Sequence, residues 1–309
     1  MADLSVELAS LALRNPILSA SGTFGHGLEM ERFSSPQKMG GLVSKTVTLR
    51  PRPGNAAPRI HETEAGLLNS IGLENRGIEA YLRDVLPEVA GADTRIFTNI
   101  GGEAAEEFAE LAAMLDERTE VDALEINLSC PNVGGGRLPF STEPALAEAV
   151  VRGVRAATRK PIFAKLSPNV TRIGEIARGA EAGGADGVTA VNTLLGMAVD
   201  WRTGRPRVAN VQAGYSGKGI KPVALRCAWE CARAVDIPVI GCGGVSSAED
   251  VLEFVVVGCS AVQVGTAAFS DPALPGNLAV RVEALLDAEG VASVRELVGT
   301  LETERKVPS

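Results

Sequence analysis

The stretch PVIGCGGVSSAEDVLEFVVVGCSAVQVGTA, residues 238–267, contains a complete structural unit that recurs along the chain. Its two apolar runs, Pro238–Gly241 and Ala261–Val264, are too short and too rich in β-branched residues for helices. Between them lie a glycine turn, the segment Ser247-Ala-Glu-Asp, which is typical of a helix capping box, and the apolar run Val251–Val257. A strand, a helix and a strand in this order predict two parallel strands joined by a crossover helix.

The same unit recurs from one end of the chain to the other. Apolar residues at helical spacing predict helices over Glu103–Glu117, with acids in its first turn, and over Thr142–Thr158, with Pro144 in its first turn. Eight short runs, several of them apolar on successive residues, have the signature of parallel strands buried on both faces. They are Ile17–Ala20, Leu42–Thr46, Arg95–Ile100, Ala123–Asn127, Ile162–Leu166, Gly187–Val191, Pro238–Gly241 and Ala261–Val264. Eight such units imply an α/β fold of the TIM (β/α)8 barrel type.

No change in composition divides the chain, so we expect a single α/β-barrel domain over residues 1–309. A Rossmann fold is the weaker alternative, because no G-x-G-x-x-G motif follows a first strand. Two longer inserted loops stand out, at about 50–77 after the second strand and about 197–220 after the sixth. Long loops at one end of a barrel usually serve function.

The composition excludes several classes of protein. With a net charge of −8, the surface repels phosphate backbones, so we expect no nucleic-acid partner. No apolar run is long enough for a membrane span, and Glu7 precedes any basic residue, unlike a signal peptide. We therefore expect a cytoplasmic protein with reduced cysteines, in which Cys227 and Cys231 are core residues. Only two histidines are present, which makes a histidine-based metal site improbable.

Polar residues and glycines follow all eight expected strands. In barrels of this kind the carboxyl ends of the strands carry the chemistry. The eight turns contain Ser21-Gly22, Lys45-Thr46, Asn99, Asn127, Lys165, Asn192-Thr193, Gly243-Gly244 and Gly265-Thr266. Turns are commonly polar, but two lysines and three asparagines at one rim favour a functional site. The last two turns, Gly243-Gly244 and Gly265-Thr266, consist largely of glycine, so their backbone N–H groups can approach an anion. Phosphate commonly binds at the turns after the last two strands of such barrels.

Two side chains leave alternatives open on the residues alone. Lys45 and Lys165 either face an anionic ligand, such as the ring of a flavin, or pair with an acid distant in sequence. Cys130 follows the fourth strand in a loop that continues into Gly134-Gly135-Gly136. A cysteine in such a loop can act as a nucleophile or base, although most lone cysteines are inert.

The segment Asn127-Leu-Ser-Cys130-Pro-Asn132 resembles the active-site loop of the class 1 dihydroorotate dehydrogenases, whose base is cysteine. The membrane-associated class 2 enzymes have serine there and an N-terminal membrane helix, and this chain has neither feature. Further motifs that resemble the family run along nearly the whole chain. They are residues 21–25 (SGTFG), 45–46 (KT), 69–73 (NSIGL), 165–170 (KLSPNV), 191–193 (VNT), 216–217 (SG), 220–225 (IKPVAL), 241–244 (GCGG) and 264–266 (VGT).

The resemblance implies roles for these residues in a single FMN-binding domain. FMN would be held by Ser21, Lys45, Thr46, Asn99, Asn127, Lys165, Val191, Gly217, Gly243, Gly244, Gly265 and Thr266, with its phosphate against the last two turns. Dihydroorotate would be held by Lys45, Asn69, Ser70, Ile71, Gly72, Leu73, Asn127, Asn192 and Thr193. Cys130, as a thiolate, would take a proton from C5 while a hydride leaves C6 for N5 of FMN, with the 134–136 loop closing over the site. No metal is implied.

The subclass follows from two further stretches. Residues 45–55 and 196–210 resemble class 1B, whose catalytic subunits form a homodimer core. That core pairs with a subunit that carries FAD and a [2Fe-2S] cluster and passes electrons to NAD⁺. This chain has no NAD fingerprint and no cysteine cluster for iron and sulfur, so a partner in a heterotetramer would supply both. The alternatives are a fumarate-dependent class 1A enzyme, a reductase of another pyrimidine such as uracil, and a barrel that only binds a phosphorylated ligand.

Overall fold

Eight parallel strands close into a barrel in the computed structural model, which describes residues 1–128 and 140–303. The expected TIM barrel is confirmed, and each strand pairs with its neighbours in chain order until the last pairs with the first. The barrel strands are β3 (Ile17–Ser19), β4 (Gly41–Val43), β7 (Arg95–Ile100), β8 (Ala123–Asn127), β9 (Ile162–Leu166), β10 (Gly187–Ala190), β15 (Val239–Cys242) and β16 (Ala261–Val264).

The continuous apolar runs form strands because both faces of the barrel wall are covered. All residues of these strands are buried apart from Arg95 at the start of β7. The strand expected over Leu42–Thr46 ends earlier, at Val43. Ser44 and Val47 still donate to carbonyls of β7, but the two donors now lie three positions apart instead of two, and between them the N–H of Lys45 donates to the carbonyl of Gly25, 2.9 Å away. That departure turns Lys45 and Thr46 to the rim.

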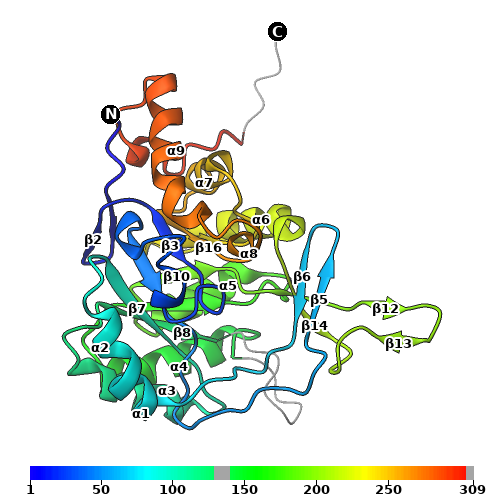
Figure 1. Cartoon of the computed structure of the whole chain (residues 1–309). Helices are drawn as coiled ribbons and strands as arrows, with labels where there is room; N and C mark the ends of the chain where they lie inside the picture. The colour runs from blue at the N-terminus through cyan, green and yellow to red at the C-terminus, as the bar shows by residue number, and fades with distance from the viewer. Residues whose placement is uncertain (129–139, 304–309) are drawn as a thin grey trace.

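Helices follow seven of the eight strands and surround the barrel (Figure 1). They are α1 (Ile78–Ala80), continued by a π-turn η3 (Tyr81–Val85) and α2 (Leu86–Val89), then α3 (Ala105–Asp116), α4 (Pro144–Ala157), α5 (Ile173–Ala182), α6 (Lys221–Ala232), α7 (Ala248–Val256), α8 (Ala267–Ser270) and α9 (Leu274–Glu289). Two 3₁₀ turns, η1 (Leu28–Met30) and η2 (Pro36–Lys38), replace a helix after β3. In α3 the side chains of Phe108, Leu111 and Leu115 are fully buried, each worth about 1.5–3 kcal/mol of stability.

The start of α7 differs in one detail from the expected capping box. Ser247 caps the helix, because its hydroxyl accepts a hydrogen bond from the N–H of Asp250 at 3.2 Å. The Asp250 carboxylate does not return a bond to Ser247. It accepts instead from the N–H and hydroxyl of Ser246, at 2.7 and 2.9 Å, and from the ammonium of Lys221 at 2.6 Å. The helix start is therefore tied to the turn that follows β15.

The two inserted segments form a sheet over the barrel rather than plain loops. Its strands are β5 (Ile60–Thr63), β6 (Gly66–Asn69), β11 (Leu194–Gly196) and β14 (Ala213–Ser216), in the order β11-β14-β6-β5. Antiparallel pairing of Gly214 with Asn69 joins the two insertions directly. A hairpin of β12 (Val199–Asp200) and β13 (Arg205–Pro206) extends away from the barrel, and Trp201 at its turn is 78% exposed (Figure 1).

The opposite end of the barrel is covered by an N-terminal hairpin of β1 (Val6–Leu8) and β2 (Leu11–Leu13). Arg95, the first residue of β7, donates to the carbonyl of Ala12, which places the hairpin at the amino ends of the strands. A last 3₁₀ turn, η5 (Val294–Leu297), caps this region: the N–H of Val294 donates to the carbonyl of Asp3, and the N–H of Asp3 donates to the carbonyl of Ala292. Among the described residues, no helix has the length and apolar character needed to cross a bilayer.

Candidate active site

A cavity of about 830 Å³ opens at the carboxyl ends of the barrel strands, beneath the sheet formed by the two insertions. Its volume lies in the range of small-molecule and cofactor sites. Most of the residues expected at the site line it. They are Ser21, Lys45, Thr46, Asn69, Ile71, Gly72, Leu73, Asn99, Asn127, Lys165, Val191, Asn192, Thr193, Gly217, Gly243, Gly244, Gly265 and Thr266.

Two expected site residues are not among them. Ser70 is fully buried outside the cavity, because successive residues at the end of β6 point to opposite sides and Asn69 takes the inward direction. The backbone of Ser70 instead bonds to the first insertion: its N–H donates to the carbonyl of Arg59 and its carbonyl accepts from Asn55. The structure therefore does not bring the Ser70 side chain to the cavity with the other expected residues, and its role at the site stays a prediction. Cys130 and the 134–136 loop lie outside the described residues.

The turn after β15 brings bare backbone to the cavity. Gly243 and Gly244 have φ values of +131° and +83°, which L side chains rarely adopt. A Cβ on Gly244 would lie 2.6–2.9 Å from the backbone and Cβ of Lys221, so no side chain fits there. The Asp250 carboxylate fixes the same turn by accepting from Ser246. The result is a rigid, open backbone surface of the kind that anions approach.

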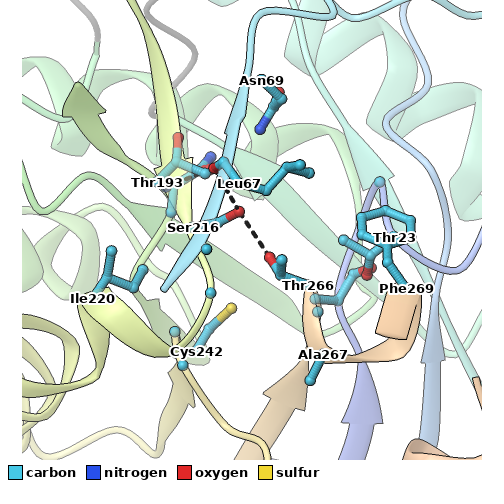
Figure 2. A pocket seen from close by; sticks show the side chains of 18 of the residues that line it. Thr23, Leu67, Asn69, Thr193, Ser216, Ile220, Cys242, Thr266, Ala267 and Phe269 are labelled. Carbon is cyan, nitrogen blue, oxygen red and sulfur yellow. Dashed lines mark hydrogen bonds between the residues drawn. The ribbon is translucent and has the colours of Figure 1, made fainter. Parts of the chain in front are cut away.

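The turn after β16 is connected to the overlying sheet. The hydroxyl of Thr266 donates to the hydroxyl of Ser216, 2.7 Å away (Figure 2). Ser216 ends β14 and its hydroxyl also donates to the carbonyl of Leu67 on β6, at 3.4 Å. One hydrogen-bonded chain therefore joins the last barrel turn to both insertions across the cavity wall.

Amide side chains gather on the other side of the cavity. The amide of Asn192 donates to the amide oxygen of Asn127 at 3.2 Å, and its own oxygen accepts from the N–H of Thr193 at 2.8 Å. Asn69 enters from β6 (Figure 2). Asn169, which sequence reasoning did not select, donates to the carbonyl of Thr193 at 3.0 Å and so supports this group from the turn after β9. Such amides offer donors and acceptors to a polar ring.

A buried polar cluster lies inside the barrel below the cavity. Its centre is Glu125, and its other members each come from a different strand: Asn99, Lys165, Thr189 and Gln263. One oxygen of Glu125 accepts from Asn99 at 2.7 Å and from Lys165 at 3.4 Å. The other accepts from Thr189 at 3.0 Å and from the amide of Gln263, whose oxygen accepts from Lys165 at 2.7 Å.

Of the two alternatives for Lys165, the structure shows the pairing with an acid distant in sequence, while its position leaves a role toward a ligand open as a prediction. It pairs with an acid 40 residues away, and it lines the cavity. Glu125, Thr189 and Gln263 were missed. One signal was available: Glu125 stands in an otherwise apolar run, two residues before Asn127, and so shares its inward face.

The charge state of Lys165 depends on this cluster. Burial acts to lower the pKa of Lys165, but the Glu125 carboxylate, the Cys242 side chain and the hydrogen bond to Glu125 outweigh burial and raise the pKa above its usual value. Burial raises the pKa of Cys242, so its thiol is neutral at neutral pH. We therefore assign the stabilising charge to Glu125.

The remaining cysteines of the described chain belong to the core. Cys227, Cys231 and Cys259 are fully buried, and burial raises the pKa of Cys227 to about 11. The expectation that Cys227 and Cys231 pack in the core is confirmed. Residues 1–128 and 140–303 contain no group of three or more His, Cys, Asp or Glu side chains that could hold a metal ion.

Comparison with known proteins gives a consistent result. The sequence model of the family described as dihydroorotate dehydrogenase matches residues 3–286. A protein from Pelobacter propionicus, named dihydroorotate dehydrogenase B (NAD(+)), catalytic subunit, is 49% identical over 300 residues, covering 97% of this chain and 99% of the relative. A protein of the same name from Bacteroides thetaiotaomicron is 44% identical over 302 residues, covering 98% of this chain and 100% of the relative.

A solved structure is similar in fold. The crystal structure of DHODH from Eimeria tenella in complex with ferulenol superposes with a TM-score of 0.80. The match covers 96% of this chain and 88% of the other, at 21% sequence identity. At this identity the likeness concerns the barrel fold alone.

Proposed function

The chain belongs to the dihydroorotate dehydrogenase family, and we propose that it is the catalytic subunit of an NAD⁺-linked enzyme that oxidises (S)-dihydroorotate to orotate in pyrimidine (UMP) biosynthesis. The resemblance to class 1B noted from the motifs agrees with the names of relatives that are 44–50% identical along almost their whole length. In this proposal residues 1–309 form one FMN-binding domain, with the insertions at about 50–77 and 197–220 serving the site.

The residues of the cavity fit a flavin mononucleotide. The amide nitrogen of Asn99 donates a hydrogen bond to Glu125. Its amide oxygen is buried and has no hydrogen-bond partner among the described residues. An unpaired acceptor beside a buried cation suits a planar ring that displays both N–H and carbonyl groups. The open backbone at Gly243 and Gly244 suits a phosphate.

We assign FMN to the residues that were expected to hold it. They are Ser21, Lys45, Thr46, Asn99, Asn127, Lys165, Val191, Gly217, Gly243, Gly244, Gly265 and Thr266. When bound, FMN supplies the two-electron acceptor of the reaction. Lys165 places a positive charge at the ring, and the turns after β15 and β16 hold the phosphate end, so the protein fixes both ends of the cofactor.

We assign the pyrimidine to the amide group and the first insertion. Asn69, Ile71 to Leu73, Asn127, Asn192 and Thr193 surround it, with Lys45 for the carboxylate. Asn192 donates to Asn127, so these two side chains are held in place before substrate arrives. Side chains that are already ordered lower the ordering cost of binding.

Cys130 is the proposed base that removes the proton from C5 of dihydroorotate. The proposal rests on the motif at residues 127–132, since Cys130 lies outside the described residues. The described cysteines do not compete for the role. Burial raises the pKa of Cys227, Cys231, Cys242 and Cys259, and a protonated thiol is a poor base.

A partner subunit completes the proposed electron path. The names of the relatives describe a catalytic subunit that uses NAD⁺, which implies a second subunit for electron transfer. We propose that this partner carries FAD and a [2Fe-2S] cluster and that two copies of each subunit form a heterotetramer around a homodimer of this chain.

The observation that carries the function is the juxtaposition of Lys165, Asn127 and the Gly243-Gly244 turn in one cavity of a chain from this family. The test is a visible spectrum of the purified protein under anaerobic conditions. We expect one FMN per chain and complete bleaching by dihydroorotate but not by dihydrouracil, which lacks the carboxylate. Rapid reoxidation by fumarate without a partner would reject the NAD⁺-linked assignment, and a protein that holds no flavin would reject the enzyme.

A further inference from the structure

Glu125 occupies an unusual position for an acid. It is fully buried in the middle of β8, and it lies behind the side chains that line the cavity. Each of its two carboxylate oxygens accepts two hydrogen bonds, from Asn99 and Lys165 on one side and from Thr189 and Gln263 on the other. A group that only accepts in four directions is an ionised carboxylate.

Two of the four partners reach the cavity, Asn99 and Lys165, and only Lys165 is charged. The ammonium of Lys165 is held from two directions, by Glu125 at 3.4 Å and by the oxygen of Gln263 at 2.7 Å. Gln263 in turn donates to Glu125, so its orientation also depends on that carboxylate. Removing the charge of Glu125 therefore affects both supports of Lys165.

We propose that Glu125 is a positioning residue that keeps the Lys165 ammonium charged and directed at the flavin, through both oxidation states of the cofactor. The inference rests on the proposed function, because it takes FMN as the occupant of the cavity. Glu125 itself touches neither cofactor nor substrate in this arrangement and acts only through Lys165.

The charges around Lys165 support this role. Among the described residues, the titratable groups that face it are Glu125 from β8 and Cys242 from β15. Cys242 is a neutral thiol at neutral pH. Lys45 lines the same cavity and carries a charge of the same sign. A lysine buried among uncharged groups loses its proton readily. The Gln263 oxygen accepts from the ammonium, but among the described residues Glu125 is the one negative charge that opposes this loss.

The test is the FMN midpoint potential as a function of pH, measured with the wild type, Glu125→Gln and Thr189→Val. Glutamine keeps the shape of Glu125 and removes its charge. In that variant Lys165 is neutral when the flavin is oxidised and takes up a proton when the flavin is reduced. We expect the potential of Glu125→Gln to fall with pH more steeply than that of the wild type. The difference is one proton per two electrons, or tenfold in the equilibrium constant per pH unit, which is about 30 mV.

Two matched variants separate this role from a structural one. Thr189→Val is nearly isosteric, removes one hydrogen bond to the same carboxylate and leaves its charge, so we expect the wild-type slope. Glu125→Gln combined with Lys165→Arg is expected to restore the wild-type slope, because a guanidinium does not lose its proton. A wild-type slope for Glu125→Gln alone overturns the proposal.

A measurement that does not need the Glu125 variant provides a second test. Lys165→Arg has a permanent charge, so the wild type and Lys165→Arg should share one slope between pH 6 and 9. A steeper wild-type slope shows that Lys165 takes up a proton on reduction and overturns the proposal. If the wild type holds no flavin, or dihydroorotate does not bleach it, the proposed function has failed rather than this inference.

Discussion

Ser216 and Thr266, 50 residues apart in sequence, join the overlying sheet to the last barrel turn through hydroxyls 2.7 Å apart. Ser216 belongs to the second insertion, and its hydroxyl also contacts the carbonyl of Leu67 in the first. Both insertions are therefore connected to the turn that we assign to the phosphate of FMN. The binding of FMN should depend on this connection.

Thr266→Val removes the donor hydroxyl and keeps the side-chain shape. A hydrogen bond of this kind is worth about 1 kcal/mol. Without it FMN must itself order the turn, so we expect FMN to bind up to about fivefold more weakly to the apoprotein. Isothermal titration with FMN measures the change. Thr300→Val is the matched control, since the Thr300 hydroxyl bonds only to the carbonyl of Leu297 at an exposed site. Equal FMN affinity in both variants contradicts the assignment.

Gly244→Ala is expected to lose FMN because a Cβ at this position meets the backbone of Lys221 at 2.9 Å. The turn must move, and the phosphate surface moves with it. Gly290→Ala is the control: Gly290 also has a positive φ, of +69°, but nothing lies within 4 Å of its Cβ. The control should cost about 1 kcal/mol of stability and retain its flavin. The flavin content after gel filtration measures retention, and a loaded Gly244→Ala protein counts against the phosphate site.

The barrel could be predicted from the sequence because its strands are buried on both faces. Runs such as Ile162–Leu166 are apolar regardless of which neighbours they pair with, so their type is visible locally. The strand over Leu42–Thr46 was predicted too long, because the change from ladder to rim depends on a bond between Lys45 and Gly25. That bond joins residues 20 positions apart, so no local sequence pattern predicts it.

The sheet of the two insertions was not predicted for a similar reason. Strand β5 is only partly buried, and β6 pairs with a strand about 145 residues away. Turn residues that line the cavity could be named because every barrel strand ends at the same rim. The partners of Lys165 could not be predicted from the sequence, because the register across five strands determines which inward-facing side chains contact one another.

Lys165→Met is expected to destabilise the protein by about 3–5 kcal/mol, because it leaves the Glu125 charge buried without its cation. Adding Glu125→Gln should recover most of this loss, since the double variant contains no buried charge at this position. Urea unfolding of the apoproteins measures the free energies. The pKa of Lys165 is higher in the folded protein than in the unfolded chain. The stabilisation by the Lys165–Glu125 ion pair is therefore complete below the ordinary lysine pKa, and it is lost only as the pH rises through the raised pKa of the folded protein.

The pH dependence of stability is a control on this comparison of the single and double variants. Between pH 6 and 9 the stability of the double variant relative to the wild type should stay constant, because Lys165 is protonated in both the folded and unfolded wild-type chains and the double variant has no ionisable group at either position. If the double variant is as unstable as Lys165→Met alone, the loss of the ion pair is not the cause of the destabilisation.

Alkylation should distinguish the five cysteines. The thiolate is the reactive form, and with the pKa of Cys227 raised to about 11, roughly one thiol in a thousand is ionised at pH 8. Cys231, Cys242 and Cys259 are also buried with raised pKa values. We expect iodoacetamide to modify Cys130 first in the native protein and all five after denaturation, as measured by peptide mass spectrometry. Native labelling of Cys227 or Cys259 ahead of Cys130 would contradict this order.

Cys130→Ser should slow the reduction of bound FMN by dihydroorotate by about 10²–10⁴-fold, because a hydroxyl is a far weaker base than a thiolate. Anaerobic stopped-flow absorbance measures the rate, and FMN content should stay at the wild-type level. The wild-type rate should rise with pH as the thiol ionises, starting from the ordinary cysteine pKa of about 8.5. In Cys130→Ser this rise should be absent up to pH 10. Cys227→Ala, on the buried face of α6, controls for the loss of a cysteine and should keep both the rate and its pH dependence. A Cys130→Ser protein that is reduced as fast as Cys227→Ala removes Cys130 from the mechanism.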